Sequence, residues 1–377
     1  MEDSETSSTS TDYARLNKTD IYWRDLYPWL KETGYELRPR FRPGWVPSWQ
    51  LDGEFPLLKE DYWGLLRRQV IDAVRIADGV NVYLKSIKDE QHPFEIEITN
   101  FLCSEPLRSD PKNHCLPLLG ILNPPALPGT RILVFKLLRK FDQPHFDTIG
   151  EAVEFFRQIF EGLQFMHKNQ VAHRDCSTMN IMMDGAHLYP HGFHPYFQSK
   201  TPDYKQHPKH LTRTQAPVKY YLIDVGISIH FDPGDEHYAL PIIGADRSVP
   251  EYQGDGPMSP TDPFATDVYL LGNLIRSQFI DGQYDMKYYM HPGREGFGFM
   301  RGLVTDMVKH NPAERPKIDE VVDRFDVIVK GLSTWKLRSR ARGKEEYTIL
   351  SIGRIFRHWY RRIGFMLRGV PALPTPK

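Results

Sequence analysis

The sequence predicts an α+β protein in which a small strand-rich region with one helix precedes a larger helical region. Two β-rich runs flank an Asp-Gly pair at 78–79, which is a strong signal for a hairpin. From residue 149 onward, apolar residues recur at helical spacing over five turns. The 377 residues are 40% hydrophobic and 25% charged, which is typical of globular proteins and allows two domains or one large two-lobed unit.

Charge and cysteine content exclude several classes of protein. Lys+Arg and Asp+Glu both total 48, whereas a general nucleic-acid binder carries a basic excess, so no nucleic-acid partner is expected. Three cysteines rule out a disulfide scaffold and fit a reducing compartment. The sequence shows neither a membrane-spanning apolar run nor the basic and apolar start of a secretory signal. We therefore expect an intracellular protein, cytoplasmic or nuclear.

The N-terminal part divides into two segments. Residues 1–20 begin with a run rich in Ser, Thr, Asp and Glu and are predicted to be a disordered, acidic and polar N-terminus. Residues 21–50 hold four tryptophans among Arg and Pro residues, an unusual content for a free linker. This second segment is predicted to be an irregular arm that packs on the main domain without regular structure of its own.

Residues 51–140 contain the predicted strands and the first helix. The hairpin strands are expected at 70–76 and 80–87, and a second pair at 116–122 and 132–138. Pro93 opens a helix candidate over 94–103. The helical region, 141–330, starts with the long helix from 149, for which Thr148 and Glu151 have the spacing of a capping box.

The strongest chemical signal is the segment VAHRDCSTMNIMMD at 171–184, directly after the long helix. His173, Arg174, Asp175 and Asn180 reproduce the H-R-D-x-x-x-x-N spacing of a kinase catalytic loop. An apolar run then ends in Asp224-Val225-Gly226, which resembles D-F-G with Val in place of Phe. Either motif carries more weight in the presence of the other.

Four further pieces occur in the matching order. Upstream, Lys85 stands in V-Y-L-K, a strand context like V-A-I-K, although a lone strand lysine usually faces solvent. Downstream, Pro250-Glu251 resembles A-P-E, and Asp267 with Gly272 resembles the D-x-W-x-x-G start of a buried helix. Arg315 resembles the arginine that pairs with the A-P-E glutamate. Each piece is common singly, but six in one order are not.

Over residues 20–330 the chain therefore resembles a eukaryotic protein kinase domain. More narrowly, it resembles the protein-kinase-like family of mushroom-forming (basidiomycete) fungi, through GYELRPRFRPGWVPSW, SDPKNHCLPLLGIL, GADRSVPEY and DPFATDVYLLGN. The resemblance implies a two-lobed fold, with a β-rich N-lobe containing one helix at 51–140 and a helical C-lobe at 141–330. It also implies transfer of the γ-phosphate of ATP, with Mg²⁺, to Ser/Thr hydroxyls of a protein substrate.

The resemblance assigns catalytic roles to four residues. Lys85 would bind the α- and β-phosphates of ATP and pair with a helix glutamate, and Asp175 would accept the proton of the substrate hydroxyl. Asn180 and Asp224 would hold magnesium between the phosphates.

The remaining roles are structural or regulatory. Arg174 would reach the activation segment at about 227–249, which carries Ser228, Tyr238 and Ser248 as candidate phosphorylation sites. His173 and Val225, next to Gly226, would belong to the apolar spine that joins the lobes. Glu251 and Arg315 would form an ion pair, and Asp267 would cap the catalytic loop from beneath.

The helix glutamate is ambiguous, because Glu95 and Glu97 lie 10 and 12 residues after Lys85. We prefer Glu97, which puts apolar Phe101 one turn on, where the family's spine requires an apolar side chain. From Glu95 that place falls to Thr99.

One departure from the pattern supports a different function. No G-x-G-x-x-G precedes Lys85, and the segment 61–76 offers only Gly64. Glycines allow backbone amides to approach phosphates closely. The alternative is therefore a pseudokinase or interaction scaffold that keeps the fold without efficient catalysis. A small-molecule phosphotransferase of kinase fold is a third hypothesis, although the P-E-Y segment and Arg315 resemble protein kinases more.

Two regions lie outside these motifs. The insertion at about 185–216 contains His187, His191, His194, His207 and His210, which could seat a metal, but it lacks Cys and helical propensity, so a flexible surface loop is the simpler interpretation. Cys176, beside the proposed base, is interpreted as a packed residue rather than a reactive thiol.

The tail, 331–377, is basic, with ten basic and two acidic residues between positions 336 and 368. An apolar stripe follows helical spacing at Ile349, Ile352, Phe356, Trp359, Ile363 and Met366. A basic amphipathic helix over 347–368 could contact a membrane or a partner groove. Alternatively, the helix could dock its stripe on its own domain and leave the arginines in solvent. We prefer this second interpretation.

Overall fold

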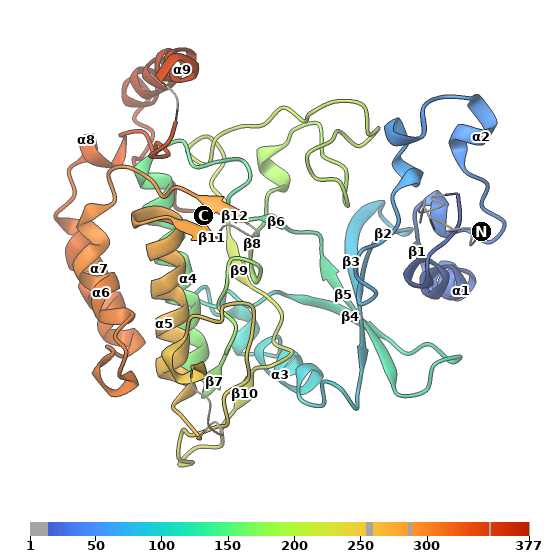
Figure 1. Ribbon diagram of the computed structural model, residues 1–377, viewed down its shortest axis with the longest axis horizontal. Coiled ribbons are helices and arrows are strands. Elements are labelled where there is room, and N and C mark those ends of the chain that lie inside the picture. Colours follow the sequence, from blue (N-terminus) through green and yellow to red (C-terminus); the bar gives the residue numbers. More distant parts are fainter. Residues whose placement is uncertain (1–13, 254–258, 286–288, 347, 377) are drawn as a thin grey trace, which may run out of the picture. The chain divides into compact units, whose positions relative to one another are not determined.

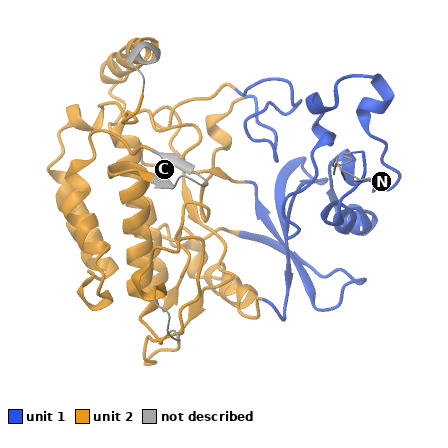
Figure 2. Cartoon of the chain, in the orientation of Figure 1, with its two compact units in different colours: residues 1–91, 118–137, 191–208 blue, residues 92–117, 138–190, 209–377 orange. Residues whose placement is uncertain are grey.

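The computed structural model describes residues 14–253, 259–285, 289–346 and 348–376 (Figure 1). The chain is a mixed α+β protein, and its backbone contacts divide it into two compact units (Figure 2). Unit 1 comprises residues 1–91, 118–137 and 191–208, and unit 2 comprises 92–117, 138–190 and 209–377. In the part of the chain that is described, no helix is both long and apolar enough to cross a membrane.

Unit 1 is built on a five-stranded antiparallel sheet. In sheet order, the strands are β1 (Tyr35–Glu36), β2 (Val70–Arg75), β3 (Val80–Lys88), β5 (Thr130–Lys136) and β4 (Leu118–Leu122). The predicted hairpin is confirmed as β2 and β3, with Gly79 in the turn at a φ of 69° that favours glycine. Val82 and Leu84 alternate along β3 toward the interior and are fully buried.

The N-terminal arm is helical, contrary to the prediction of an arm without regular structure. Helix α1 (Lys18–Glu32) begins with a capping box between Asn17 and Asp20, so the predicted disorder of 1–20 is wrong from Asn17 onward. Trp23 and Leu30 are fully buried. They are seven residues apart and lie on the same face of the helix, a spacing that the sequence displays. Pro28 lies inside α1 and argues against a helix in the sequence, because proline normally interrupts helices. Residues 1–13 lie outside the described residues.

The rest of the arm packs on the same core, and that part of the prediction is confirmed. The arm and the sheet share one hydrophobic cluster to which Trp23, Leu37 and Phe41 contribute. The buried Arg40 guanidinium lies 2.8 Å from the Asp20 carboxylate and ties the arm to the start of α1. The short elements of the arm are η1 (Pro39–Phe41) and α2 (Ser48–Asp52), which η2 (Pro56–Leu58) and η3 (Glu60–Tyr62) follow.

Part of the predicted insertion is also built into unit 1. His194 is buried, its Nδ1 accepts hydrogen bonds from the backbone of Tyr196 and Phe197, and its Nε2 lies 3.6 Å from Glu60. The Tyr196 ring lies 4.6 Å from the Arg38 guanidinium. Residues 193–198 of the insertion are therefore packed on unit 1, whereas much of 199–208 is exposed, as expected for a surface loop. Among the described residues, no group of three or more His, Cys, Asp and Glu side chains could hold a metal ion.

Unit 2 is mainly helical. The long helix is confirmed as α4 (Ile149–Lys168), with Thr148 as N-cap. The capping box is incomplete, because the Glu151 carboxylate accepts from the Asp147 backbone at 2.7 Å instead of from Thr148. Around α4 lie α5 (Pro263–Ile275), α6 (Arg301–Met307) and α7 (Ile318–Lys330), joined in the core by the rings of Phe155, Phe156, Phe279, Phe297 and Phe325.

Three more helices and several short strands complete the described part of unit 2. The helices α3 (Glu95–Leu102), α8 (Thr334–Leu337) and α9 (Thr348–Leu367) complete the set used below. A three-stranded sheet has the order β6 (Arg139–Lys140), β8 (Ile181–Met183) and β9 (Tyr220–Leu222), and β7 (Val171–Ala172) pairs with β10 (Ile229–His230). A further hairpin joins β11 (Gln283–Asp285) and β12 (Tyr289–His291). Helix α3 belongs to this unit, although the predicted boundary at 140 puts it with the strands.

Candidate functional site

The loop at 173–180 is held by one buried carboxylate from α5. Asp267 accepts the backbone N–H groups of His173 and Arg174 at 2.7 and 2.6 Å, and its Oδ2 lies 3.0 Å from Nε2 of His167. Arg174 has a φ of 69°, a strained conformation for a residue with a side chain. The charge-assisted hydrogen bonds to Asp267 stabilise this turn, which fixes the backbone just before Asp175.

Asp175 and Asn180 meet across this loop. The Asn180 side-chain amide donates to Oδ2 of Asp175 at 2.8 Å and to its backbone carbonyl at 3.1 Å. Oδ1 of Asp175 accepts the backbone N–H of Ala245 at 3.0 Å. The half-buried Asp175 carboxylate is thus oriented by hydrogen bonds on both of its oxygens, which suits a group that must accept a proton in a defined direction.

Strand pairing brings Asp224 to the same place. Ile181 of β8 lies opposite Leu222 of β9, and the Ile223 N–H donates to the Asn180 carbonyl at 2.9 Å. Asn180 directly precedes β8 and Asp224 closely follows β9, so antiparallel pairing places them at one end of the sheet. The φ of 65° at Asp224 marks a strained turn, in which the Gly226 N–H donates to the Asp224 carboxylate at 3.3 Å.

The α3 glutamate beside this turn is Glu95, whereas Glu97, the one preferred from the sequence as the partner of Lys85, lies on the exposed face of the helix. Glu95 is 2% exposed, whereas Glu97 faces solvent. A Cβ on Gly226 would lie 3.0 Å from Oε2 of Glu95 and 3.1 Å from Oδ1 of Asp224, so the two carboxylates flank the glycine. Thr99, the polar residue one turn on, is accommodated because its hydroxyl donates to the Glu95 carbonyl at 2.6 Å.

The contacts predicted for Arg174 with the segment 227–249 and for Arg315 with Glu251 are both present. The Arg174 guanidinium donates to the Leu240 carbonyl, and burial lowers the pKa of Arg174 from its ordinary value. Arg315 and Glu251 form two hydrogen bonds of 2.7 and 2.6 Å with almost no exposure of either side chain. This pair joins the segment that ends at η6 (Pro250–Tyr252) to the loop before α7.

Several other residues singled out in the sequence differ in burial and in their contacts. Cys176 is fully buried, and burial raises the pKa of its thiol, so it is a packed residue and not a nucleophile. Ser228 is buried and donates to the His173 carbonyl at 3.0 Å, unlike the exposed Tyr238 and Ser248. Val225 is half-buried, and the His173 ring lies 3.1 Å from the Ile223 carbonyl.

The remaining site residue, Lys85, and the only glycine of the segment 61–76, Gly64, belong to unit 1. Lys85 is half-buried on β3, opposite Val70 of β2 and Leu133 of β5. A Cβ on Gly64 would lie 2.6 Å from Asn17 and 2.8 Å from the Asp20 carboxylate. Gly64 is therefore required for close packing at the start of α1.

The donor set suits magnesium rather than a transition metal. Asn180 uses its amide nitrogen on Asp175, so its Oδ1 oxygen is the atom that remains for a cation. One amide oxygen and the Asp224 carboxylate would supply only oxygen ligands and part of a shell, which suits Mg²⁺, an ion that also uses water and substrate phosphates. A comparison with models of known protein families found none that matches this chain.

Proposed function

We propose that this chain is an ATP- and Mg²⁺-dependent protein kinase of the type it resembles, which transfers the γ-phosphate of ATP to Ser/Thr hydroxyls of proteins. The observation that carries the proposal is the convergence of Asp175, Asn180 and Asp224 in unit 2. Three stretches that are distant in sequence hold these residues in place: the proposed catalytic loop, the β8–β9 pair and Asp267 of α5.

The chemistry requires these groups. Phosphoryl transfer passes through a loose, anionic transition state, so catalysis consists mostly of positioning and charge neutralisation. Asp175 would accept a hydrogen bond, and then the proton, from the attacking hydroxyl, while Asn180 keeps the carboxylate in place. Asn180 Oδ1 and Asp224 would hold Mg²⁺, which neutralises charge on the phosphates. Lys85 is the residue assigned to the α- and β-phosphates.

A second candidate function is a scaffold with inefficient catalysis, and one observation favours it. Gly64, the only glycine of the segment 61–76, is committed to packing against Asn17 and Asp20. The connection between β1 and β2 is instead occupied by η1, α2, η2 and η3. A glycine-rich loop lets backbone amides approach phosphates closely. This connection contains no such loop, so it does not provide that approach.

The identity of the acceptor tests the proposal. The full chain would be incubated with γ-labelled ATP and Mg²⁺ and offered Ser/Thr peptides, Tyr peptides, amino alcohols and sugars. The proposal expects label on Ser/Thr peptides. Label on the small molecules alone would identify a small-molecule phosphotransferase, and no label on any acceptor would favour the scaffold.

Replacing the buried Glu95 should lower activity, whereas replacing the exposed Glu97 should leave activity unchanged. In Glu95→Gln, the carboxylate beside the Asp224–Gly226 turn is lost, and we expect the apparent affinity for Mg²⁺ to fall by about tenfold or more, as for supporting groups around other metal sites. Glu97→Gln, the matched control, should behave like the wild type. The measurement is the initial transfer rate as a function of Mg²⁺ concentration. Equal effects of the two substitutions would remove Glu95 from the site.

Gly244 should tolerate no side chain, because it lies against the proposed base. A Cβ there would be 2.6 Å from Oδ1 and 2.7 Å from Cγ of Asp175. Gly244→Ala must therefore displace the Asp175 carboxylate or the 244–245 backbone, and we expect kcat to fall by about 10²-fold. Gly302→Ala in α6, where a Cβ meets nothing within 4 Å, is the control. Wild-type kcat in a folded Gly244→Ala variant would contradict this geometry.

A further inference from the structure

Helix α9 carries its apolar residues on the side that faces solvent. We define the α9 stripe as the exposed large apolar and aromatic residues Ile352, Ile355, Phe356, Trp359, Tyr360, Ile363, Met366 and Leu367. Their exposure runs from 39% at Ile355 to 84% at Leu367. The amphipathic helix is as predicted, but the preferred docking of its stripe on the domain is wrong. Ile349 lies outside the residues whose side chains are described.

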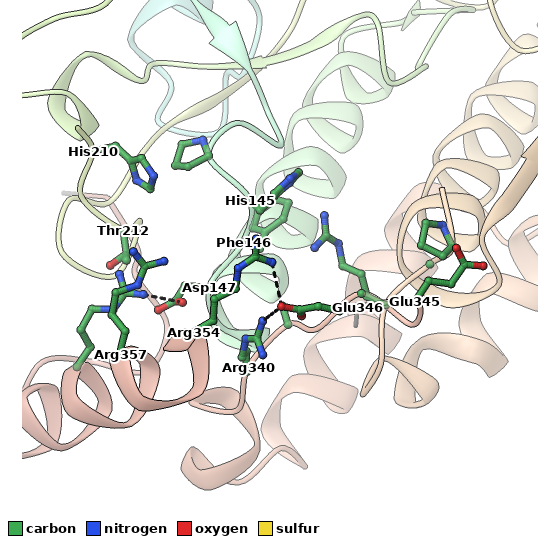
Figure 3. Close-up of a pocket in the computed structure, with 17 residues that line it drawn as sticks. His145, Phe146, Asp147, His210, Thr212, Arg340, Glu345, Glu346, Arg354 and Arg357 are labelled. Atoms are coloured by element: carbon green, nitrogen blue, oxygen red, sulfur yellow. Dashed lines mark hydrogen bonds and ion pairs between the residues drawn. The ribbon is translucent and has the colours of Figure 1, made fainter. Parts of the chain in front are cut away.

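The opposite face of α9 docks on unit 2 through cations. Arg361 lies 3.0 Å from the Asp147 carboxylate. Arg354 lies 2.9 Å from Glu346 (Figure 3). The buried Arg362 guanidinium lies 3.6 Å from the centre of the Trp335 ring on α8. These residues recur at helical spacing on one side, so the polar face is turned inward and the α9 stripe outward.

Both ends of the helix are anchored as well. Before it, Glu346 pairs with Arg340 as well as with Arg354. After it, the Val370 carbonyl accepts from Arg338, and the Thr375 hydroxyl donates to Glu154 at 3.1 Å. Rotation of α9 to bury its stripe would break these contacts and those of Arg361 and Arg362. The outward stripe is therefore a fixed feature of unit 2.

We propose that the α9 stripe binds an anionic membrane surface. A contiguous exposed apolar patch of this kind marks an interaction site. The sequence from 347 to 377 contains no Asp or Glu, and Arg368, just after the helix, is exposed. Two copies packed through this helix would bring like charges together, whereas anionic lipid headgroups complement them. Trp359 and Tyr360 are the residue types that favour the membrane interface, and the helix would lie on the surface without spanning it.

Vesicle binding tests this proposal independently of catalysis, because no ATP is needed. The full chain would be sedimented with vesicles of phosphatidylcholine alone and of phosphatidylcholine with phosphatidylserine. We expect binding to the anionic vesicles, weakened by salt. Phe356→Ser/Trp359→Ser should reduce that binding by about tenfold or more, because both exposed rings lose their burial in lipid. Leu51→Ser/Leu58→Ser, an exposed apolar pair in unit 1, is the control and should bind normally.

Tryptophan emission adds a local readout. Binding should shift the emission to shorter wavelength, and Trp359→Phe should keep the binding while losing most of the shift. Failure to bind anionic vesicles, or equal binding by Phe356→Ser/Trp359→Ser, would overturn the proposal. A dimer in light scattering that dissociates in that double variant would assign the stripe to a second copy and overturn it too.

Discussion

Asp175→Asn is expected to lower kcat by about 10²–10⁴-fold, the usual contribution of a positioned general base. An asparagine has nearly the same size, so the hydrogen bond from Ala245 can persist through the amide oxygen. It cannot accept a proton from the attacking hydroxyl, and its amide nitrogen would face that of Asn180 across the present 2.8 Å contact. The KM for ATP should change little, because the lesion concerns the acceptor side.

Steady-state kinetics of phosphate transfer measure this effect, with Asp326→Asn as control. Asp326 is an exposed residue of α7 in the same unit, so the same chemical change there should leave kcat unchanged. Both variants should unfold at the wild-type temperature. A folded Asp175→Asn protein with wild-type kcat would show that another group accepts the proton.

Asp267→Asn is expected to destabilise unit 2 by about 2–4 kcal/mol and to reduce activity with it. The fully buried Asp267 accepts two backbone N–H groups at 2.7 and 2.6 Å. An asparagine amide can present its oxygen to only one of these donors and sets an N–H against the other. Hydrogen bonds to a charged group contribute about 1.5–3 kcal/mol each, and an unsatisfied buried donor is costly. The strained turn at Arg174 should also relax.

Denaturant unfolding gives the free-energy change, and a substitution five residues away is its control. Asp262 is the N-cap of α5, where its carboxylate accepts from the Phe264 backbone at 2.8 Å. Asparagine caps helices about as well as aspartate, so Asp262→Asn should stay within about 0.5 kcal/mol of the wild type. If Asp267→Asn is as stable as Asp262→Asn, Asp267 does not hold the loop at 173–180.

Local patterns made much of this molecule predictable. The β2–β3 hairpin depends on neighbouring residues around Asp78-Gly79, and α4 on a sustained apolar period with a threonine cap. The H-R-D-x-x-x-x-N spacing singled out Asp175 and Asn180, which meet within one loop. The apolar run before Asp224 was recognised as a strand, which is β9. These features arise from short-range geometry, which a sequence displays directly.

Features that depend on tertiary packing were not predictable. Pro28 concealed α1, although burial of Trp23 and Leu30 outweighs its cost. Spacing alone could not separate Glu95 from Glu97, because burial decides between them and depends on what α3 packs against. The stripe of α9 was visible, but its direction is set by acids distant in sequence, above all Asp147. The one sequence feature that bears on this direction is the number of arginines on the face opposite the stripe.

The most direct test of the central claim is the dependence of γ-phosphate transfer on magnesium and on Asp224. Wild type, Asp224→Ala and Glu236→Ala would be incubated with γ-labelled ATP, with Mg²⁺ or with a chelator of divalent cations. Glu236 is an exposed acid of the same segment and serves as the control. The account predicts labelling by wild type and Glu236→Ala in Mg²⁺, and its loss in Asp224→Ala and in chelator. Folded wild type that labels neither an acceptor nor itself, or Asp224→Ala that labels like the wild type, would contradict it.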